Sequence, residues 1–162
     1  MPPAVEDPDT VTVAETGVGK FQVAVLAAGA SFLADEPVAA GGLGSGPNPY
    51  DLLCAALGAC TAMTLRLYAE RKGWPLARAT VRVLHTRASD GGDRFAREVT
   101  LEGALDAEQR RRLLEIAERC PVHRTLERPA EILTIAAQPP ALEERERAGV
   151  GHLRAMEAAC ED

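Results

Sequence analysis

A long helical pattern in the first half of the chain limits the folds that this sequence can adopt. Asn48 suits an N-cap, Pro49 suits the first helical position, and Asp51 places a carboxylate where it favours the helix dipole. Apolar or small residues then recur at spacings of three and four, the period of one helical face, at Leu53, Leu57, Cys60, Thr64 and Leu67. These patterns predict a central helix over residues 49–72, ended by Gly73 and buried on several sides.

Alternating apolar and polar residues predict short strands on both sides of this helix. Glycine-containing turns at residues 17–19 and 89–93 join neighbouring strands, and a loop with four glycines covers residues 41–47. The expected strands cover residues 11–13, 21–25, 31–34, 80–85, 97–102 and 131–136. The sequence therefore combines strands before and after one long helix.

A second helix is predicted after Asp106, which forms a capping-box pattern with Gln109 three residues later. Its apolar stripe consists of Leu113, Ile116, Ala117 and Cys120. Pro121 interrupts the helix, and residues 122–126 are expected to form a short further helix.

Composition indicates one domain with an appendage at each end. Residues 1–10 contain three prolines and three acidic residues, so we expect a flexible N-terminal tail. Residues 11–138 are expected to form the domain, because a chain of 162 residues is short for two. Residues 139–162 are charged and rich in alanine, and we expect a solvated helical extension that is interrupted near residues 149–151.

Charge and hydropathy narrow the function. Lys and Arg total 18 against 24 Asp and Glu, a net charge of −6, and aromatic residues make up only 4%. This composition argues against a nucleic-acid-binding protein, which needs a basic face and stacking rings. No apolar run approaches the ~18 residues of a membrane span, and the N-terminus lacks the features of a signal peptide. We expect a cytoplasmic protein with no nucleic-acid or membrane partner.

Four cysteines, at positions 54, 60, 120 and 160, carry the clearest chemical pattern. They form no CxxC pair and no histidine pair has metal-ligand spacing, so we expect no metal site. In a reducing cytosol a structural disulfide is a poor default, and buried bystander thiols are the simplest interpretation. Cys54 lies about 240° around the helix from Cys60, so these two cannot bridge, and Cys160 is expected to be exposed.

Cys60 and Cys120 differ from the other two because both lie on the inward stripes of predicted helices. Elements packed in one core could bring their thiols together. Cys120 also precedes Pro121 and could cap the short helix that begins there, where unpaired backbone N–H groups lower the pKa of a thiol. His123 and Arg124, which follow, are expected on the surface.

Two segments resemble the cysteine motifs of the OsmC/Ohr family, the osmotically inducible and organic-hydroperoxide-resistance proteins. The first segment, GPNPYDLL followed by AALGAC and MTL, covers residues 46–65 and contains Cys60. The second, RCPVH at residues 119–123, contains Cys120 at the end of a helix and before a proline. The order of elements is also similar, over roughly residues 11–137, so residues 11–138 resemble an OsmC-like domain.

The resemblance implies an α+β fold in which two chains intertwine, with long central helices packed between strongly bent antiparallel sheets. It implies a homodimer with active sites at its interface and a thiol-dependent peroxidase reaction on organic hydroperoxides, with hydrogen peroxide a poorer substrate. Cys60 would be the peroxidatic cysteine and Cys120 the resolving one, and an external thiol would reduce their disulfide. No cofactor is implied.

The chain departs from the family beside the first motif. Organic-hydroperoxide-resistance proteins carry a glutamate after the Asn–Pro pair, where it pairs with an arginine from the N-terminal strands. Here Tyr50 and then Asp51 follow that pair, no arginine precedes Arg66, and Lys20 is the basic residue of the early strands. Lys20, Tyr50 and Asp51 are therefore the candidates for supporting Cys60, although Asp51 also suits a simple helix-start carboxylate.

Two functions stay open at this point. The retained cysteine pair favours the peroxidase. The missing Glu–Arg pair favours a non-catalytic OsmC-like dimer that binds a small apolar ligand in the interface pocket, because an apolar pocket suits both alkyl peroxides and lipid-like ligands.

Overall fold

The computed structural model describes residues 10–136 and 148–161. The chain forms two compact units, one up to Leu53 and one from Cys54 onward. The N-terminal tail expected over residues 1–10 and the beginning of the C-terminal extension at residues 139–147 lie outside the described residues, except for residue 10.

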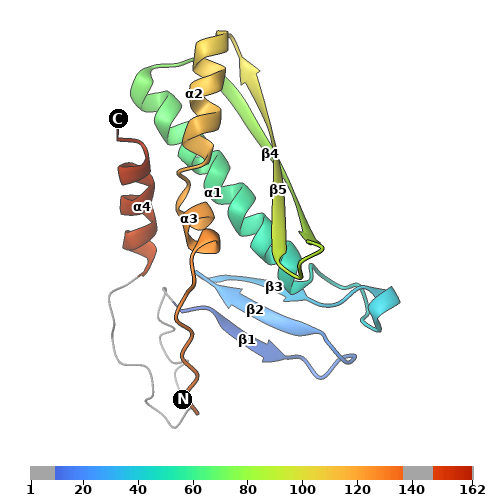
Figure 1. Cartoon of the computed structure of the whole chain (residues 1–162). Coiled ribbons are helices and arrows are strands. Elements are labelled where there is room, and N and C mark those ends of the chain that lie inside the picture. Colours follow the sequence, from blue (N-terminus) through green and yellow to red (C-terminus); the bar gives the residue numbers. More distant parts are fainter. Residues whose placement is uncertain (1–9, 137–147, 162) are drawn as a thin grey trace. The chain divides into compact units, whose positions relative to one another are not determined.

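The first unit is an antiparallel three-stranded sheet with the strand order β1-β2-β3. It consists of β1 (Thr12–Glu15), β2 (Val23–Ala27) and β3 (Ala30–Ala34), drawn in blue in Figure 1. A short 3-10 helix, η1 (Val38–Ala40), follows the sheet. The structure thus confirms three of the expected strands, with bounds shifted by up to two residues.

The predicted glycine-rich loop is organised by one buried carboxylate. Asp35 accepts hydrogen bonds from the backbone N–H groups of Glu36, Leu43 and Ser45, and from the Ser45 hydroxyl at 2.7 Å. A Cβ at Gly46 would lie 2.0 Å from the carbonyl oxygen of Leu33, so a side chain there would displace the backbone. This loop leads directly into the long helix.

The long helix, α1 (Pro49–Lys72), has the bounds that the sequence predicts. Asn48 and Asp51 form a reciprocal cap, in which each side chain accepts a hydrogen bond from the backbone N–H of the other, at 2.9 and 3.0 Å. At the other end Gly73 adopts a left-handed conformation, with φ of 63°, which favours glycine over other residues.

We expected no apolar run as long as a membrane span. By length and composition alone, however, α1 could cross a membrane, because an 18-residue stretch of it has a mean hydropathy of 1.5. Only 39% of that stretch is buried within the described chain. The buried residues of α1 lie between positions 57 and 69 and are Leu57, Cys60, Thr61, Thr64, Leu65, Tyr68 and Ala69.

The second unit packs α1 against a long hairpin and a second helix. The hairpin strands β4 (Leu76–Arg87) and β5 (Asp93–Gly103) pair antiparallel, with Val81 opposite Val99, and extend beyond the predicted 80–85 and 97–102. The helix α2 (Ala107–Ala117) begins with the predicted capping box, in which Asp106 accepts from the Gln109 backbone. Figure 1 shows α1 and α2 running along this hairpin.

The core of this unit joins the three elements. Leu65 and Tyr68 from α1 pack with Leu113 and Ile116 from α2, and Leu101 of β5 packs against them. The predicted inward stripe of α2 is thereby confirmed. The short helix α3 (Pro121–Glu127) follows, with Cys120 at its N-cap position, as predicted. Helices together with antiparallel sheets make this an α+β structure, whereas the intertwined dimer stays a prediction.

The strand expected at residues 131–136 is wrong. This segment has no regular secondary structure, and the apolar side chains of Ile132, Leu133 and Ile135 are exposed. Within residues 10–136 and 148–161 the segment pairs with neither sheet, and a strand needs a hydrogen-bonded neighbour.

The C-terminal extension also differs from its prediction. Its described part is one continuous helix, α4 (Ala148–Ala159), without an interruption near residues 149–151. Nor is it fully solvated, because Met156 and Cys160 are buried. Cys160, expected to be exposed, is 5% exposed, belongs to the core of the second unit, and donates a hydrogen bond from Sγ to the Thr64 carbonyl.

Candidate functional site

Two thiols from different elements of the second unit meet in a buried apolar cluster. Cys60 of α1 and Cys120, the N-cap of α3, pack with Leu57, and they are 2% and 0% exposed. Their side chains lie close enough for the Cys60 thiol to donate a hydrogen bond to a Cys120 thiolate. Both are free thiols. The structure therefore brings together the two cysteines that the helical stripes placed on inward faces.

Local sequence explains the position of Cys120. Pro121 cannot donate a backbone hydrogen bond within a helix, so α2 ends and a new helix starts with this proline in its first turn. Cys120 is left between the two helices in an extended conformation, with φ of −53° and ψ of 134°. Its Sγ forms no side-chain capping hydrogen bond. The backbone N–H of His123 nevertheless stabilises a thiolate there and so lowers the pKa of Cys120.

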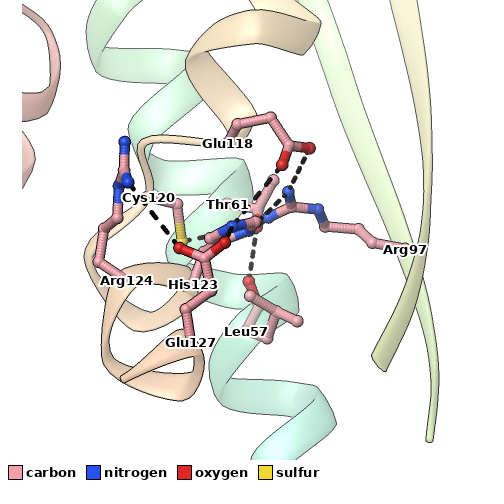
Figure 2. A network of polar contacts seen from close by, with 8 residues as sticks. All are labelled: Leu57, Thr61, Arg97, Glu118, Cys120, His123, Arg124 and Glu127. Atoms are coloured by element: carbon pink, nitrogen blue, oxygen red, sulfur yellow. Dashed lines mark hydrogen bonds and ion pairs between the residues drawn. The ribbon is translucent and has the colours of Figure 1, made fainter. Parts of the chain in front are cut away.

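A buried arginine connects the opposite strand to this thiol, as Figure 2 shows. Arg97 of β5, whose side chain is 8% exposed, donates to Thr61 Oγ1 at 2.8 Å and to Glu118 Oε1 at 3.1 Å. Thr61 Oγ1 in turn lies 3.7 Å from Cys120 Sγ and 2.7 Å from the Leu57 carbonyl oxygen. Thr61 has one hydroxyl proton, so its bond to Leu57 must break before that proton can stabilise a Cys120 thiolate.

His123 completes the network on the other side of Arg97. Its Nδ1 lies 3.2 Å from Arg97 Nη2, and an arginine can only donate, so Nδ1 accepts and the proton is on Nε2. That Nε2 lies 2.9 Å from Glu127 Oε1, and the other carboxylate oxygen of Glu127 lies 3.8 Å from Arg124 Nη1. His123 is thus largely buried, contrary to the surface position expected for it, whereas Arg124 is exposed as expected.

These contacts shift the pKa values of the two thiols in opposite directions. The hydrogen bond from Cys60, assisted by the N–H of His123 and the hydroxyl of Thr61, lowers the pKa of the Cys120 thiol although burial opposes the shift. Donating that hydrogen bond raises the pKa of the Cys60 thiol, and burial adds to the effect. Once the first proton has left, the pair therefore carries its single negative charge on Cys120.

Cys60 has two further polar neighbours. The backbone N–H of Val122, in the first turn of α3, donates to Cys60 Sγ at 3.5 Å. The ring of His152 on α4 approaches from another side, with Nε2 3.4 Å from the same sulfur. A residue of the C-terminal extension thus contacts the first cysteine directly.

A pocket of about 360 Å³ opens beside the cysteine cluster. Its lining comes from α1, the hairpin and α3, and consists of Leu57, Asp93, Phe95, His123, Leu126 and Glu127. Leu57 belongs to the cysteine cluster and Phe95 packs against it. The pocket therefore offers a partly apolar space one residue layer away from the thiols.

The supporting candidates from the sequence belong to the first unit and are described there. Asp51 forms the reciprocal cap of α1, Tyr50 is 42% exposed, and the Lys20 ammonium lies 4.8 Å from the centre of the Phe21 ring. A role of these three residues towards Cys60 stays a prediction. Cys54 lies on α1 and lines a different pocket.

Sequence analysis missed the polar residues of the site that surround the two cysteines: Thr61, Arg97, Glu118, Glu127 and His152. Thr61 follows Cys60 and lies beside the predicted stripe. Arg97 occupies a predicted strand, in which an arginine is by default a solvated charge. Its inward orientation could be recognised only from the pairing of β5 with β4 and their packing on α1.

A family model for OsmC-like proteins matches residues 42–134, which include Cys60 and Cys120 and end before α4. Among the curated proteins, none matches the chain significantly.

Several solved structures share the fold. An OsmC-like protein from Mycoplasma pneumoniae is 19% identical, with 73% of this chain and 86% of that chain covered and a TM-score of 0.61. An organic hydroperoxide resistance protein from Elizabethkingia anophelis is 22% identical, with 71% and 84% covered and a TM-score of 0.55. The organic hydroperoxide resistance protein OhrB of Bacillus subtilis is 24% identical, with 72% and 87% covered and a TM-score of 0.51. These similarities confirm the α+β class and the OsmC-like fold.

Proposed function

The chain belongs to the family of OsmC-like proteins, and on this basis we propose that it is a thiol-dependent peroxidase that reduces organic hydroperoxides. The observation that carries the proposal is the packing of Cys60 and Cys120 together in one buried cluster. Structural neighbours named as organic hydroperoxide resistance proteins support the same substrate class.

The reaction uses the two thiols in sequence. Cys60, as a thiolate, attacks the outer oxygen of the hydroperoxide, the O–O bond breaks, and the products are a sulfenic acid on Cys60 and an alcohol. Cys120 then attacks the sulfenic sulfur, which releases water and forms a disulfide. An external thiol reduces this disulfide and restores both cysteines.

The electrostatics suit Cys120 to the second step. Its lowered pKa keeps it ionised near neutral pH, and a thiolate, not a thiol, attacks a sulfenic sulfur. Because the two cysteines pack in one cluster, the disulfide can form without a large movement of the chain. The sulfenic acid would therefore be short-lived, which protects Cys60 from further oxidation.

The pocket beside the pair favours an alkyl hydroperoxide over hydrogen peroxide. Leu57, Phe95 and Leu126 give it apolar walls that can bury an alkyl chain. Each buried CH₂ group contributes roughly 0.8 kcal/mol, and hydrogen peroxide has none to offer. Hydrogen peroxide is therefore the poorer substrate.

The assembly and its setting are part of the proposal. The largely uncovered apolar surface of α1 needs a cover, and a second copy of the chain supplies it in an intertwined homodimer. We place the protein in the cytoplasm, where thiol reductants are abundant.

Anaerobic titration of the fully reduced protein with cumene hydroperoxide tests this function. We expect loss of two thiols per equivalent of peroxide, with one cumyl alcohol formed, and repeated turnover after addition of dithiothreitol. Hydrogen peroxide, used in parallel, should react more slowly.

One observation favours the second candidate, a non-catalytic protein that binds a small apolar ligand. The pKa of Cys60 is raised, so this thiol is neutral in the resting pair and unreactive unless its proton is removed. If the titration consumes no thiol while a fatty acid binds in the pocket, the ligand-binding function replaces the peroxidase.

A further inference from the structure

We propose that His152, carried by the C-terminal helix α4, is the acid–base residue that removes the proton from Cys60 and returns it to the leaving alcohol. The inference rests on the proposed peroxidase function. It concerns a segment outside the family match, which ends at residue 134. The observation behind it is the contact of 3.4 Å between His152 Nε2 and Cys60 Sγ.

Several contacts hold α4 against the rest of the second unit. Arg71 of α1 donates to the Glu157 carbonyl at 3.1 Å and its other terminal nitrogen lies 3.9 Å from the Glu157 carboxylate. Cys160 Sγ donates to the Thr64 carbonyl, one helical turn after Cys60. Arg119, which precedes Cys120, donates to the Glu161 carbonyl at 3.2 Å.

These hydrogen bonds connect α4 and the residues after it to both segments that carry the cysteines. Arg71 and Thr64 belong to α1, which carries Cys60, and Arg119 directly precedes Cys120 in the chain. Met156 and Cys160 are buried at the same contact, so the apolar face of α4 also contributes. The position of His152 is therefore fixed by several independent contacts, not by its own contact with sulfur alone.

The chemistry requires a base at this sulfur. Cys60 is a buried thiol, and the amide of Val122, which donates to its sulfur, cannot accept a proton. An imidazole in contact with the sulfur can accept one, and histidine is the side chain that most often serves as a general base. His152 is the residue of the described chain that makes such a contact.

The proton balance of the first step is then complete. Nε2 of His152 takes the proton of the Cys60 thiol, and the thiolate forms a bond to the outer oxygen of the hydroperoxide. The O–O bond breaks, and the leaving alkoxide takes the proton from the imidazolium. Sulfur is oxidised to sulfenic acid, the hydroperoxide is reduced to an alcohol, and His152 returns to its neutral form.

The first test measures turnover of cumene hydroperoxide by the full chain with three α4 variants. His152→Ala should lower kcat by about 100-fold, the lower end of the usual contribution of general acid–base catalysis. His152→Gln keeps an amide near the position of Nε2 but cannot accept a proton, so it should be as slow as His152→Ala. Leu153→Ala, on the exposed side of the same helix, should turn over like the unmodified protein.

The second test does not use peroxide, so it separates this inference from the proposed function. In a Cys120→Ser background, the rate of Cys60 alkylation by iodoacetamide at pH 7 reports the thiolate of Cys60 alone. We expect His152→Gln to slow this alkylation about tenfold or more, because the base that ionises the thiol is lost.

The outcomes are distinguishable. If His152→Gln turns over and is alkylated at unmodified rates, His152 only packs against the sulfur and the inference is wrong, while the peroxidase stands. If alkylation depends on His152 but no variant or parent consumes peroxide, the role of His152 as a base stands and the peroxidase does not.

Discussion

Arg97 and Cys120 are connected through a single hydroxyl group, since Arg97 Nη1 donates to Thr61 Oγ1 at 2.8 Å and that oxygen lies 3.7 Å from Cys120 Sγ. The arginine occupies the oxygen of Thr61 as a donor, so the hydroxyl proton of Thr61 can go to the Leu57 carbonyl or, once that bond breaks, to the sulfur. Thr61 thus links a charge on β5 to the sulfur at the start of α3. The arrangement supplies an arginine–glutamate pair, Arg97 with Glu118, from positions that the family motif does not predict.

Replacing the connecting hydroxyl tests this link. Thr61→Val keeps the volume of the side chain but removes the hydrogen bond to Cys120 and leaves Arg97 without that acceptor. We expect the pKa of Cys120 to rise by roughly one unit, so the pH profile of its alkylation rate should shift upward by the same amount. Thr125→Val on α3, whose hydroxyl bonds only locally to the Pro121 carbonyl, is the matched control. Equal pH profiles in both variants would contradict the link.

The pH dependence of the thiol pair has a definite direction. Because the pKa of Cys120 is lowered and that of Cys60 is raised, one thiolate should form below the ordinary thiol value of about 8.5 and the second well above it. Thiolate absorbance at 240 nm, followed in a Cys54→Ser, Cys160→Ser background, measures both steps. The lower step should disappear when Cys120→Ser is added. If it persists, Cys60 and not Cys120 is the thiol that ionises first.

The core prediction uses two neighbouring leucines of α2. Leu113 is fully buried against α1, so Leu113→Ala should lower the free energy of unfolding by about 2–5 kcal/mol. Leu114 is 48% exposed, and Leu114→Ala should cost well under half of that. Urea denaturation of both variants decides, and similar losses would show that the two side chains are equally buried in solution.

Assembly is tested by sedimentation equilibrium at micromolar concentration. The apolar surface left on α1 and the exposed apolar side chains of residues 131–136 lead us to expect a homodimer that buries more than ~2,000 Å² in total. A stable monomer would contradict the homodimer, and another part of the chain or another partner would then have to cover these apolar surfaces.

The features that the sequence predicted well depend on neighbours within a few residues. Asn48 and Asp51 cap α1, Asp106 caps α2, and Cys120 precedes Pro121 at the start of α3, each through contacts three residues apart or closer. Such contacts follow from local backbone geometry, which sequence patterns describe well.

The wrong strand and the missed site residues involve long-range packing. The alternation at residues 131–136 is typical of a strand, but a strand also needs a partner that local sequence does not name. Cys160 and His152 lie in a polar, alanine-rich segment, and only the docking of α4 on α1 buries the first and brings the second to Cys60. No spacing pattern connects positions 92 residues apart.

The order of attack by the two cysteines is the central claim, and dimedone labelling tests it most directly. Single Cys60→Ser and Cys120→Ser proteins would each receive one equivalent of cumene hydroperoxide with dimedone present, followed by mass spectrometry of the tryptic peptides. We expect the Cys120→Ser protein to carry the label on Cys60, because the sulfenic acid of Cys60 has lost the thiol that condenses with it. We expect the Cys60→Ser protein to carry no label and not to turn over. A label on Cys120 in the Cys60→Ser protein, with turnover retained, would contradict it and make Cys120 the residue that attacks the peroxide.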